Sequence, residues 1–109
     1  MTVSDVAKHL NLTCHVDAEG QRAVEGGYVG DLLSWVIGKA GSGNAWITIM
    51  SNPNVAAVAM LADTSMIILA EGVQPDDMLL EKAKQHGLNL YTAAEGAYEL
   101  AYRLHGLIG

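Results

Sequence analysis

The chain has 109 residues, of which 50% are hydrophobic and 17% are charged. This length and composition predict one globular domain over residues 1–109 and exclude a disordered chain. The net charge is −6, and the six lysines and arginines are scattered along the chain, so nucleic acid is not an expected partner. The single cysteine, Cys14, cannot form an internal disulfide, and it stands in an apolar stretch where we expect it to be buried.

The N-terminal residues and the hydropathy pattern bear on localisation. Residues 1–5 contain no basic region followed by an apolar run, which argues against a signal peptide. No apolar run approaches the roughly 20 residues that a helix needs to span a bilayer. We therefore expect a cytoplasmic protein with no membrane partner.

The first part of the chain predicts a helix, a strand and a glycine-rich connection. Thr2 and Asp5 have the spacing of a capping box, and apolar residues at helical spacing follow them. Residues 12–16 are typical of a strand, and residues 22–24 of a second, shorter one. The segment Gly-Gly-Tyr-Val-Gly at residues 26–30 is expected to lead into a helix over residues 31–40.

The middle of the chain gives the strongest structural signal. Residues 45–50 and 66–70 are short, nearly continuous apolar runs, which is typical of parallel strands that are buried on both faces. Between them, Asn52 is the expected N-cap of a helix and Pro53 its first residue. This order predicts a βαβ unit with a right-handed crossover.

The last part of the chain continues the alternation. Pro75 is expected to start a helix that ends at Gly87, and residues 88–91 are expected to form a strand. Thr92 and Glu95 have capping-box spacing for a final helix. Alternating strands and helices predict an α/β fold with a parallel-rich sheet and helices on both of its faces.

Glycines and polar residues follow the predicted strands and suggest a binding site. Ligands of open parallel sheets bind beyond the carboxyl ends of the strands. Paired glycines let a backbone approach a ligand, a tyrosine ring can stack, and amides and carboxylates can hydrogen-bond. Residues of these types also serve as ordinary turns and caps. The candidate ligand-binding residues are Gly26, Gly27, Tyr28, Asp31, Ser51, Asn52, Asn54 and Glu71.

The sequence contains no recognisable catalytic constellation. The segment at residues 41–44 follows a predicted helix and precedes a strand, which is the reverse of the order in a phosphate loop. No serine has a nucleophile-elbow context, and the four histidines are scattered. Asp31 and Glu71 could form a carboxylate pair or, with Asn54, a metal site, but nothing else supports either. We therefore predict a protein that is not an enzyme and has no cofactor and no metal.

Three segments, residues 26–36, 45–50 and 67–75, resemble a stand-alone DRTGG domain. The resemblance covers roughly residues 12–103, and the family is similar to the N-terminal domain of HPr kinase/phosphorylase. It implies a MurF-like, three-layer α/β/α sandwich with a mostly parallel sheet of four to five strands, acting as a regulatory or ligand-binding module. Where that family has a Thr-Gly-Gly-like turn, this chain has Ala70-Glu71-Gly72, which makes the expected cleft more acidic.

Two functions from different classes fit these observations. The first is a non-catalytic regulatory domain that senses a small molecule, nucleotide-like in character, at the carboxyl edge of the strands. The second is a protein–protein interaction or dimerisation module without a ligand, which acts on a partner enzyme or signalling protein. The helix expected over residues 31–40 has no charge between Asp31 and Lys39, and residues 54–62 are uncharged. Such apolar helices need cover beyond the sheet, which predicts a homodimer under either hypothesis.

Overall fold

A computed structural model describes all residues, 1–109. Its five strands form one sheet in the order β1-β5-β4-β3-β2. In chain order the elements are α1 (Val3–His9), β1 (Thr13–Val16), β2 (Gly26–Val29), α2 (Leu33–Lys39), β3 (Asn44–Thr48), α3 (Asn54–Ala62), β4 (Met66–Leu69), α4 (Asp77–His86), β5 (Leu90–Thr92) and α5 (Ala97–Ile108). None of these helices combines the length and the apolarity that crossing a bilayer requires.

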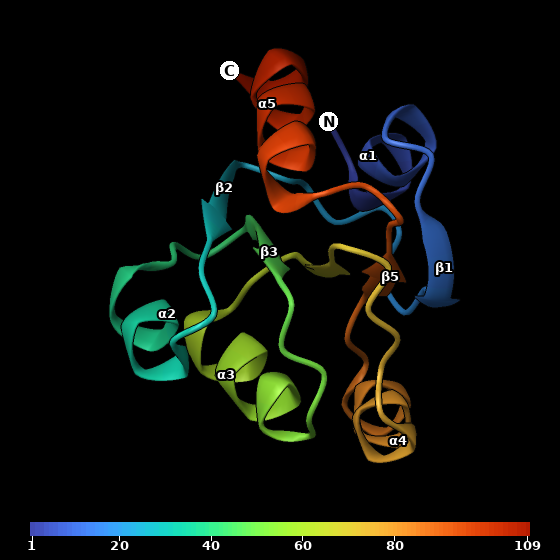
Figure 1. Ribbon diagram of the computed structural model, residues 1–109, viewed down its shortest axis with the longest axis vertical. Helices are drawn as coiled ribbons and strands as arrows, with labels where there is room; N and C mark the ends of the chain where they lie inside the picture. The colour runs from blue at the N-terminus through green and yellow to red at the C-terminus, as the bar shows by residue number, and fades with distance from the viewer.

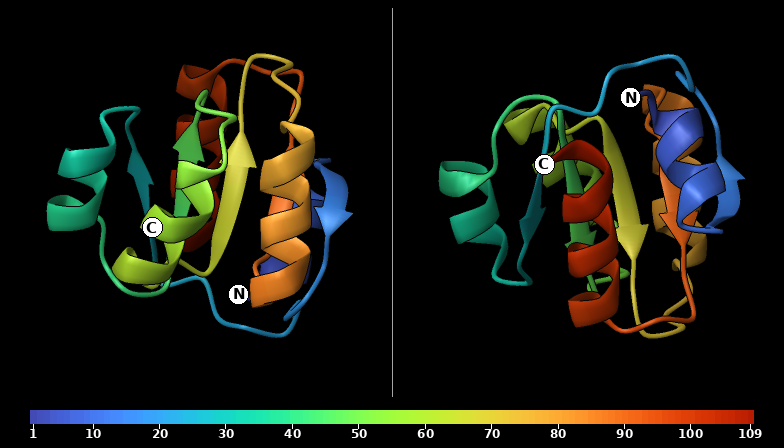
Figure 2. Two further views of the ribbon diagram at one scale, coloured as in Figure 1. Left: turned by 90° about the horizontal axis from the view of Figure 1, so that it is seen from below. Right: turned by 90° about the horizontal axis from the view of Figure 1, so that it is seen from above.

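The chain forms the three-layer α/β/α sandwich that was predicted. Strands β2 to β5 are parallel to one another, and β1 pairs with β5 in the antiparallel sense. The crossover helices α2, α3 and α4 cover one face of the sheet, while α1 and α5 cover the other (Figure 1, Figure 2). All three crossovers therefore lie in one layer, and the helix that follows the last strand crosses to the opposite layer.

Side chains that alternate along the central strands make both layers of the core. Ala45 and Ile47 of β3 pack in the cluster with α1 and α5, whereas Trp46 between them packs in the cluster with α2, α3 and α4. In β4, Ile68 packs in the cluster with α1 and α5, and Ile67 packs in the cluster with α2, α3 and α4. Burying one such side chain contributes roughly 1.5–3 kcal/mol. Strands β3 and β4 are thus buried on both faces, as the apolar runs predicted, although β3 ends at Thr48 and Ile49 beyond it is exposed.

The glycine-rich segment is a strand, which corrects the sequence prediction. Gly26 and Gly27 lie opposite Asn44 and Ala45 in a parallel ladder, so they form the start of an edge strand. A Cβ atom at Gly27 would lie 2.8 Å from Cδ2 of Leu104, which packs on it from α5. The glycine therefore makes room for a helix and does not make a turn. The strand expected at residues 22–24 is a single bridge between Thr2 and Ala23.

The capping box at the start of α1 is confirmed. The Thr2 amide donates to Asp5 Oδ2 at 3.0 Å, and the Asp5 amide donates to Thr2 Oγ1 at 3.2 Å. The carboxylate of Asp5 is exposed, and its hydrogen bonds with Thr2 lower its pKa. Local spacing was sufficient here because both partners belong to the same helix turn.

The capping box expected at Thr92 is wrong. Helix α5 begins at Ala97 with Gly96 as its N-cap, four residues after the expected N-cap. Thr92 is still inside β5, where its hydroxyl is 2.9 Å from Nε2 of His15. Glu95 instead forms an ion pair with Arg103. Thr92 therefore pairs with β4 as part of β5 and does not cap a helix, although its spacing to Glu95 fits a capping box.

Several other boundaries differ by one or two residues. Pro53 is the N-cap of α3, and Asn52 precedes it and accepts the Asn54 amide at 2.9 Å. Helix α4 begins at Asp77, later than expected, and ends at Gly87 with φ +67°, as predicted. Helix α2 begins at residue 33 and not at 31.

Cys14 is exposed, which is a second correction. It lies on β1, an edge strand, opposite Tyr91 of β5. Apolar neighbours in sequence do not decide burial on an edge strand, where alternate side chains face outward. The buried ring is that of Tyr91, whose pKa is raised to about 12 by burial and by its proximity to Asp17 and Cys14.

Candidate functional site

Two hollows flank the edge strand β2, one on each side of it. The hollow toward α2, the α2-side hollow, has a volume of about 360 Å³ and is lined by Tyr28, Val29, Gly30, Asp31, Leu32 and Trp35. The hollow toward α5, the α5-side groove, has a volume of about 310 Å³. Tyr28 and Val29 line both. Both volumes fall in the range of small-molecule pockets, about 300–1,000 Å³.

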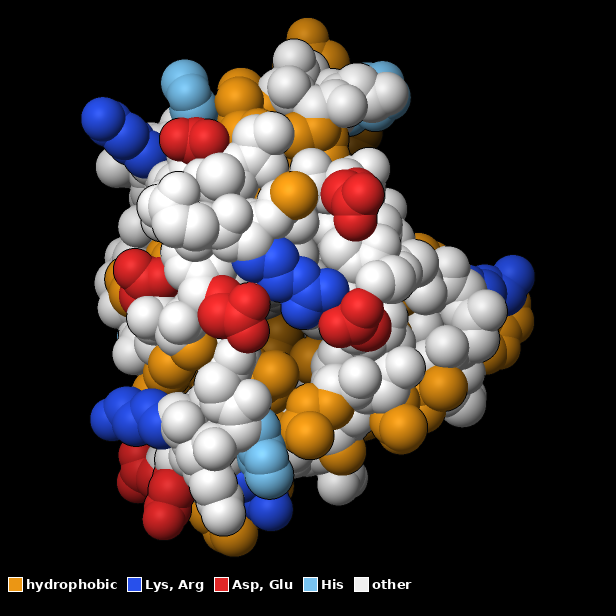
Figure 3. All heavy atoms as spheres, turned by 180° about the vertical axis from the view of Figure 1, so that it is seen from behind, with side chains coloured by type: hydrophobic (Ala, Val, Ile, Leu, Met, Phe, Trp, Pro, Cys, Tyr) orange, Lys and Arg blue, Asp and Glu red, His pale blue; other side chains and the backbone are white.

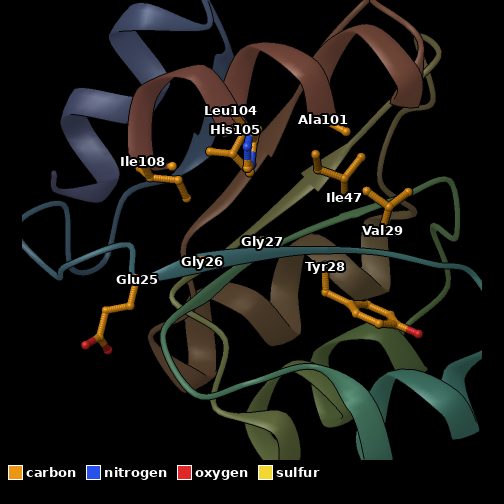
Figure 4. A pocket seen from close by; sticks show the side chains of 11 residues that line it. Glu25, Gly26, Gly27, Tyr28, Val29, Ile47, Ala101, Leu104, His105 and Ile108 are labelled. Atoms are coloured by element: carbon orange, nitrogen blue, oxygen red, sulfur yellow. The ribbon is translucent and has the colours of Figure 1, made fainter.

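Strand alternation places an aromatic ring in the α2-side hollow. Val29 points toward α5, and Tyr28 points the other way, toward α2 (Figure 4). Trp35, in the first turn of α2, is 57% exposed and supplies a second ring. The Nζ atom of Lys39 lies 4.7 Å from the centre of that ring, a cation–π contact that holds the indole against the helix.

Asp31 brings a fixed carboxylate to the same hollow. Its Oδ1 atom accepts two hydrogen bonds, from Thr48 Oγ1 at 2.8 Å and from the Ile49 amide at 3.0 Å. These bonds tie the loop after β2 to the carboxyl end of β3 and leave Oδ2 free. The indole N–H of Trp46 donates to the Gly30 carbonyl at 2.9 Å, which fixes the turn just before Asp31. The hollow therefore has an oriented acceptor and no cationic lining residue.

The remaining predicted residues at the carboxyl edge line neither hollow. The Ser51 hydroxyl donates to Asp76 Oδ1 at 3.2 Å, and the Asn52 side chain accepts the amide of Asn54. Oε2 of Glu71 accepts the Ala97 amide at 3.3 Å at the start of α5. These groups serve turns and helix starts, so the structure brings together Tyr28 and Asp31 of the predicted set and leaves the others apart from them.

Gly26 and Gly27 line the α5-side groove instead. Its lining is mixed: Val29, Ile47, Ala101, Leu104 and Ile108 are apolar, whereas Glu25, His105 and backbone groups are polar. The contribution of α5 was missed in the sequence, although residues 101, 104, 105 and 108 have the spacing of one helical face. That signal identifies a stripe on a helix but not the strand that faces it.

The loop at residues 41–44 lies at the amino end of β3 and is occupied by structural contacts. The Gly43 amide donates to the carbonyl of Asp63 at 2.9 Å, and the Ser42 hydroxyl donates to Oδ2 of the same residue at 2.5 Å. Together with Arg22, Ser42 lowers the pKa of the Asp63 carboxyl. No cluster of three or more histidine, cysteine, aspartate and glutamate side chains is placed to hold a metal ion.

Comparison with known proteins yields a structural neighbour. No family model matches the chain, and no curated protein matches it. A crystal structure of the CBS and DRTGG domains of the regulatory region of Clostridium perfringens pyrophosphatase, complexed with the activator diadenosine tetraphosphate, superposes with a TM-score of 0.74 at 14% identity. The match covers 94% of this chain and 45% of that chain, so this chain spans less than half of its neighbour.

The likeness shows a shared fold. It confirms the mostly parallel α/β/α sandwich, and one of the domains named in the neighbour belongs to the family that the sequence resembles. The neighbour is the regulatory region of its protein.

Proposed function

We propose that the chain is a single DRTGG-like, non-catalytic regulatory domain that binds a nucleoside-like ligand in the α2-side hollow. One observation carries the proposal. The rings of Tyr28 and Trp35 and the oriented carboxylate of Asp31 line the same hollow, which has a volume of about 360 Å³. The neighbour's regulatory region, which was crystallised with a nucleotide activator, supports a sensing role for this fold.

The chemistry of the lining selects the ligand class. Tyr28 and Trp35 offer faces on which a base can stack, and such stacking contributes about 1–3 kcal/mol per base. Oδ2 of Asp31 can accept from a ribose hydroxyl, as acidic residues do at the strand ends of dinucleotide-binding folds. A phosphate beside this carboxylate would be repelled. The ligand therefore presents a base and a sugar to the hollow and directs any phosphate away from it.

The other predicted residues belong to the same edge. Ser51, Asn52, Asn54 and Glu71 follow β3 and β4 at their carboxyl ends, beyond the α2-side hollow. In this proposal they contact only a ligand that extends past Asp31. A nucleoside alone is recognised without them.

A titration with the four common ribonucleosides tests the proposal through Trp35 fluorescence and amide chemical shifts. We expect one nucleoside to quench the exposed Trp35 and to shift the amides of residues 28–35. Trp35→Ala should weaken binding by about tenfold or more, because stacking is lost. Asp31→Asn should weaken it by about tenfold, because the charge-assisted hydrogen bond is lost while an oxygen remains for Thr48 and Ile49. Asn54→Ala is the matched control, and the absence of any shift with all four nucleosides would contradict the proposal.

A homodimer without a ligand is the second candidate, and the outer surface of α2 and α3 favours it. Leu32, Ile37, Met60 and Leu61 are 60%, 44%, 48% and 72% exposed. Viewed from behind, hydrophobic side chains gather in the lower right of the molecule, over these helices (Figure 3). Covering this surface with a second copy would remove it from water. Sedimentation at high micromolar concentration should show a dimer that Leu61→Glu dissociates, whereas a wild-type monomer would contradict this candidate.

A further inference from the structure

Strand β2 is an open edge of the sheet. The Gly30 amide donates to the Ile47 carbonyl at 3.2 Å, and Tyr28 lies opposite Trp46 in the parallel ladder. Because backbone groups of successive strand residues alternate in direction, Gly27 and Val29 direct their N–H and C=O groups away from the sheet. An edge of this kind is a template for another strand.

Apart from its short length of four residues, β2 lacks the devices that protect edge strands. Its sequence, Gly-Gly-Tyr-Val, contains no proline or lysine, and its register with β3 is regular. The other edge strand, β1, has an irregular register between Cys14 and Val16, which is one of the devices by which natural edges resist pairing. The contrast singles out β2 as the edge that is able to accept a partner.

The α5-side groove runs beside this edge (Figure 4). Its floor includes Val29 and Ile47 from the sheet, and Ala101, Leu104 and Ile108 of α5 form its wall. A strand added to β2 would direct every second side chain to the α5 side, where the groove can receive an apolar one. Edge pairing with a pocket for alternate side chains is a recurrent mode of peptide recognition.

The charges around β2 identify the occupant. Glu25 immediately precedes the strand and Asp31 lies two residues after it; both are exposed, and the chain carries a net charge of −6. A second copy that paired antiparallel with β2 would bring the acidic ends together, which is unfavourable. We propose that the α5-side groove binds an extended segment of a partner protein, with cationic residues flanking a central apolar residue, which adds to β2 as a further strand. This site lies on the other side of β2 from the nucleoside site proposed above, although Tyr28 and Val29 border both hollows and Asp31 belongs to both proposals.

A peptide titration tests the inference in the absence of nucleosides. The probe is acetyl-Lys-Thr-Leu-Thr-Lys-amide, and its control has aspartate in place of leucine. We expect hydrogen exchange at the Gly27 and Val29 amides to slow by about tenfold or more on binding, whereas the Tyr28 amide, already paired with β3, changes little. The control peptide should bind at least about tenfold more weakly, because its carboxylate would lie against Val29, Ile47 and Leu104 and near the carboxylate of Glu25.

Protein variants separate the groove from the rest of the molecule. Ala101→Trp fills the groove and should weaken peptide binding by about tenfold or more, whereas Ala57→Trp, on the exposed surface of α3, should not. Val29→Pro removes an outward N–H and should also abolish binding. The melting temperature of each variant establishes that it is folded.

Three outcomes would overturn the inference. These are a peptide that protects no β2 amide, a folded Ala101→Trp variant that binds as wild type does, and a dimer whose Gly27 and Val29 amides are protected without peptide. Trp35→Ala should lose nucleoside binding but retain peptide binding, and Ala101→Trp should do the reverse. Failure of one site is therefore distinguishable from failure of the other.

Discussion

The two ends of the parallel strands are built in different ways. At the amino end, the side chain of Asn89 is only 4% exposed and makes four hydrogen bonds to backbone groups that are distant in sequence. It accepts the amides of Ala18 and Glu19 at 3.0 and 2.8 Å, and it donates to the carbonyls of Glu19 and Ser65 at 3.0 and 2.9 Å. One buried amide thus joins three segments of the chain.

Arg22 also connects segments that are distant in sequence at the same end. Its guanidinium donates to the carbonyl oxygens of Thr64 and Asp63 at 3.2 and 2.9 Å and forms an ion pair with the Asp63 carboxylate. Viewed from behind, the molecule shows cationic atoms flanked by acidic side chains near its centre (Figure 3). These contacts connect the segment before β2 to the loop before β4.

At the carboxyl end the polar side chains are more accessible, and each makes one or two hydrogen bonds rather than four. Asn52 bonds to a residue two positions away, and Asp31 to the neighbouring strand end. Side chains that each make several hydrogen bonds therefore hold the fold together at one end, while the other end keeps exposed groups that a ligand can reach. Substitutions should therefore separate stability from binding according to the end that they change.

The largest expected effect is at Asn89. Asn89→Ala removes four hydrogen bonds and leaves buried backbone groups unpaired, so we expect the free energy of unfolding to fall by about 3 kcal/mol or more. Urea unfolding of the variant and of the wild type measures this loss of free energy. The matched change at the other end, Asn52→Ala, should cost about 1 kcal/mol or less. Equal losses of unfolding free energy in Asn89→Ala and Asn52→Ala would contradict the difference between the two ends.

A smaller effect is expected at Arg22. Arg22→Ala should lower the free energy of unfolding by about 1–2 kcal/mol, because a charged donor to two backbone carbonyls is lost from a partly exposed site. Arg22→Lys should recover only part of this loss, since an ammonium group cannot reproduce the planar fork of donors. Nucleoside and peptide binding should be unchanged in folded Arg22→Ala, and a large change in either would contradict the division between the two ends.

The smallest effect concerns Asp63 in acid. Its hydrogen bonds with Ser42 and Arg22 and the charge of Arg22 hold its pKa below the ordinary value of 3.8. Its stabilising contribution is therefore present above pH 3.8 and is lost as pH falls through the lowered pKa of the folded state. Urea midpoints measured from pH 5 to pH 2 should fall less steeply in Asp63→Asn than in wild type. Identical slopes would show that Asp63 does not contribute to the acid sensitivity.

Much of the fold was predictable because its signals are local. The apolar runs of β3 and β4 are too short and too continuous for surface helices, and Gly87 marks the end of α4. The candidate site was predictable in part: the structure places Tyr28 and Asp31 at one hollow, while Trp35, which lines it too, lies in an apolar helix where its sequence context gives no sign of a binding role. Glycine at 26 and 27 is compatible with both a loop and a crowded strand, so composition alone favoured the wrong one.

By itself, the sequence determined the α/β class, the two buried central strands and the lack of a phosphate loop, because each follows from composition and spacing within a few residues. Only the tertiary structure decided that β2 is an open edge, that α5 packs on Gly27, and that Asp31 is fixed by Thr48. The last two features depend on residues that are 77 and 17 positions apart, and contacts over that range are set by how the layers pack and not by any local pattern.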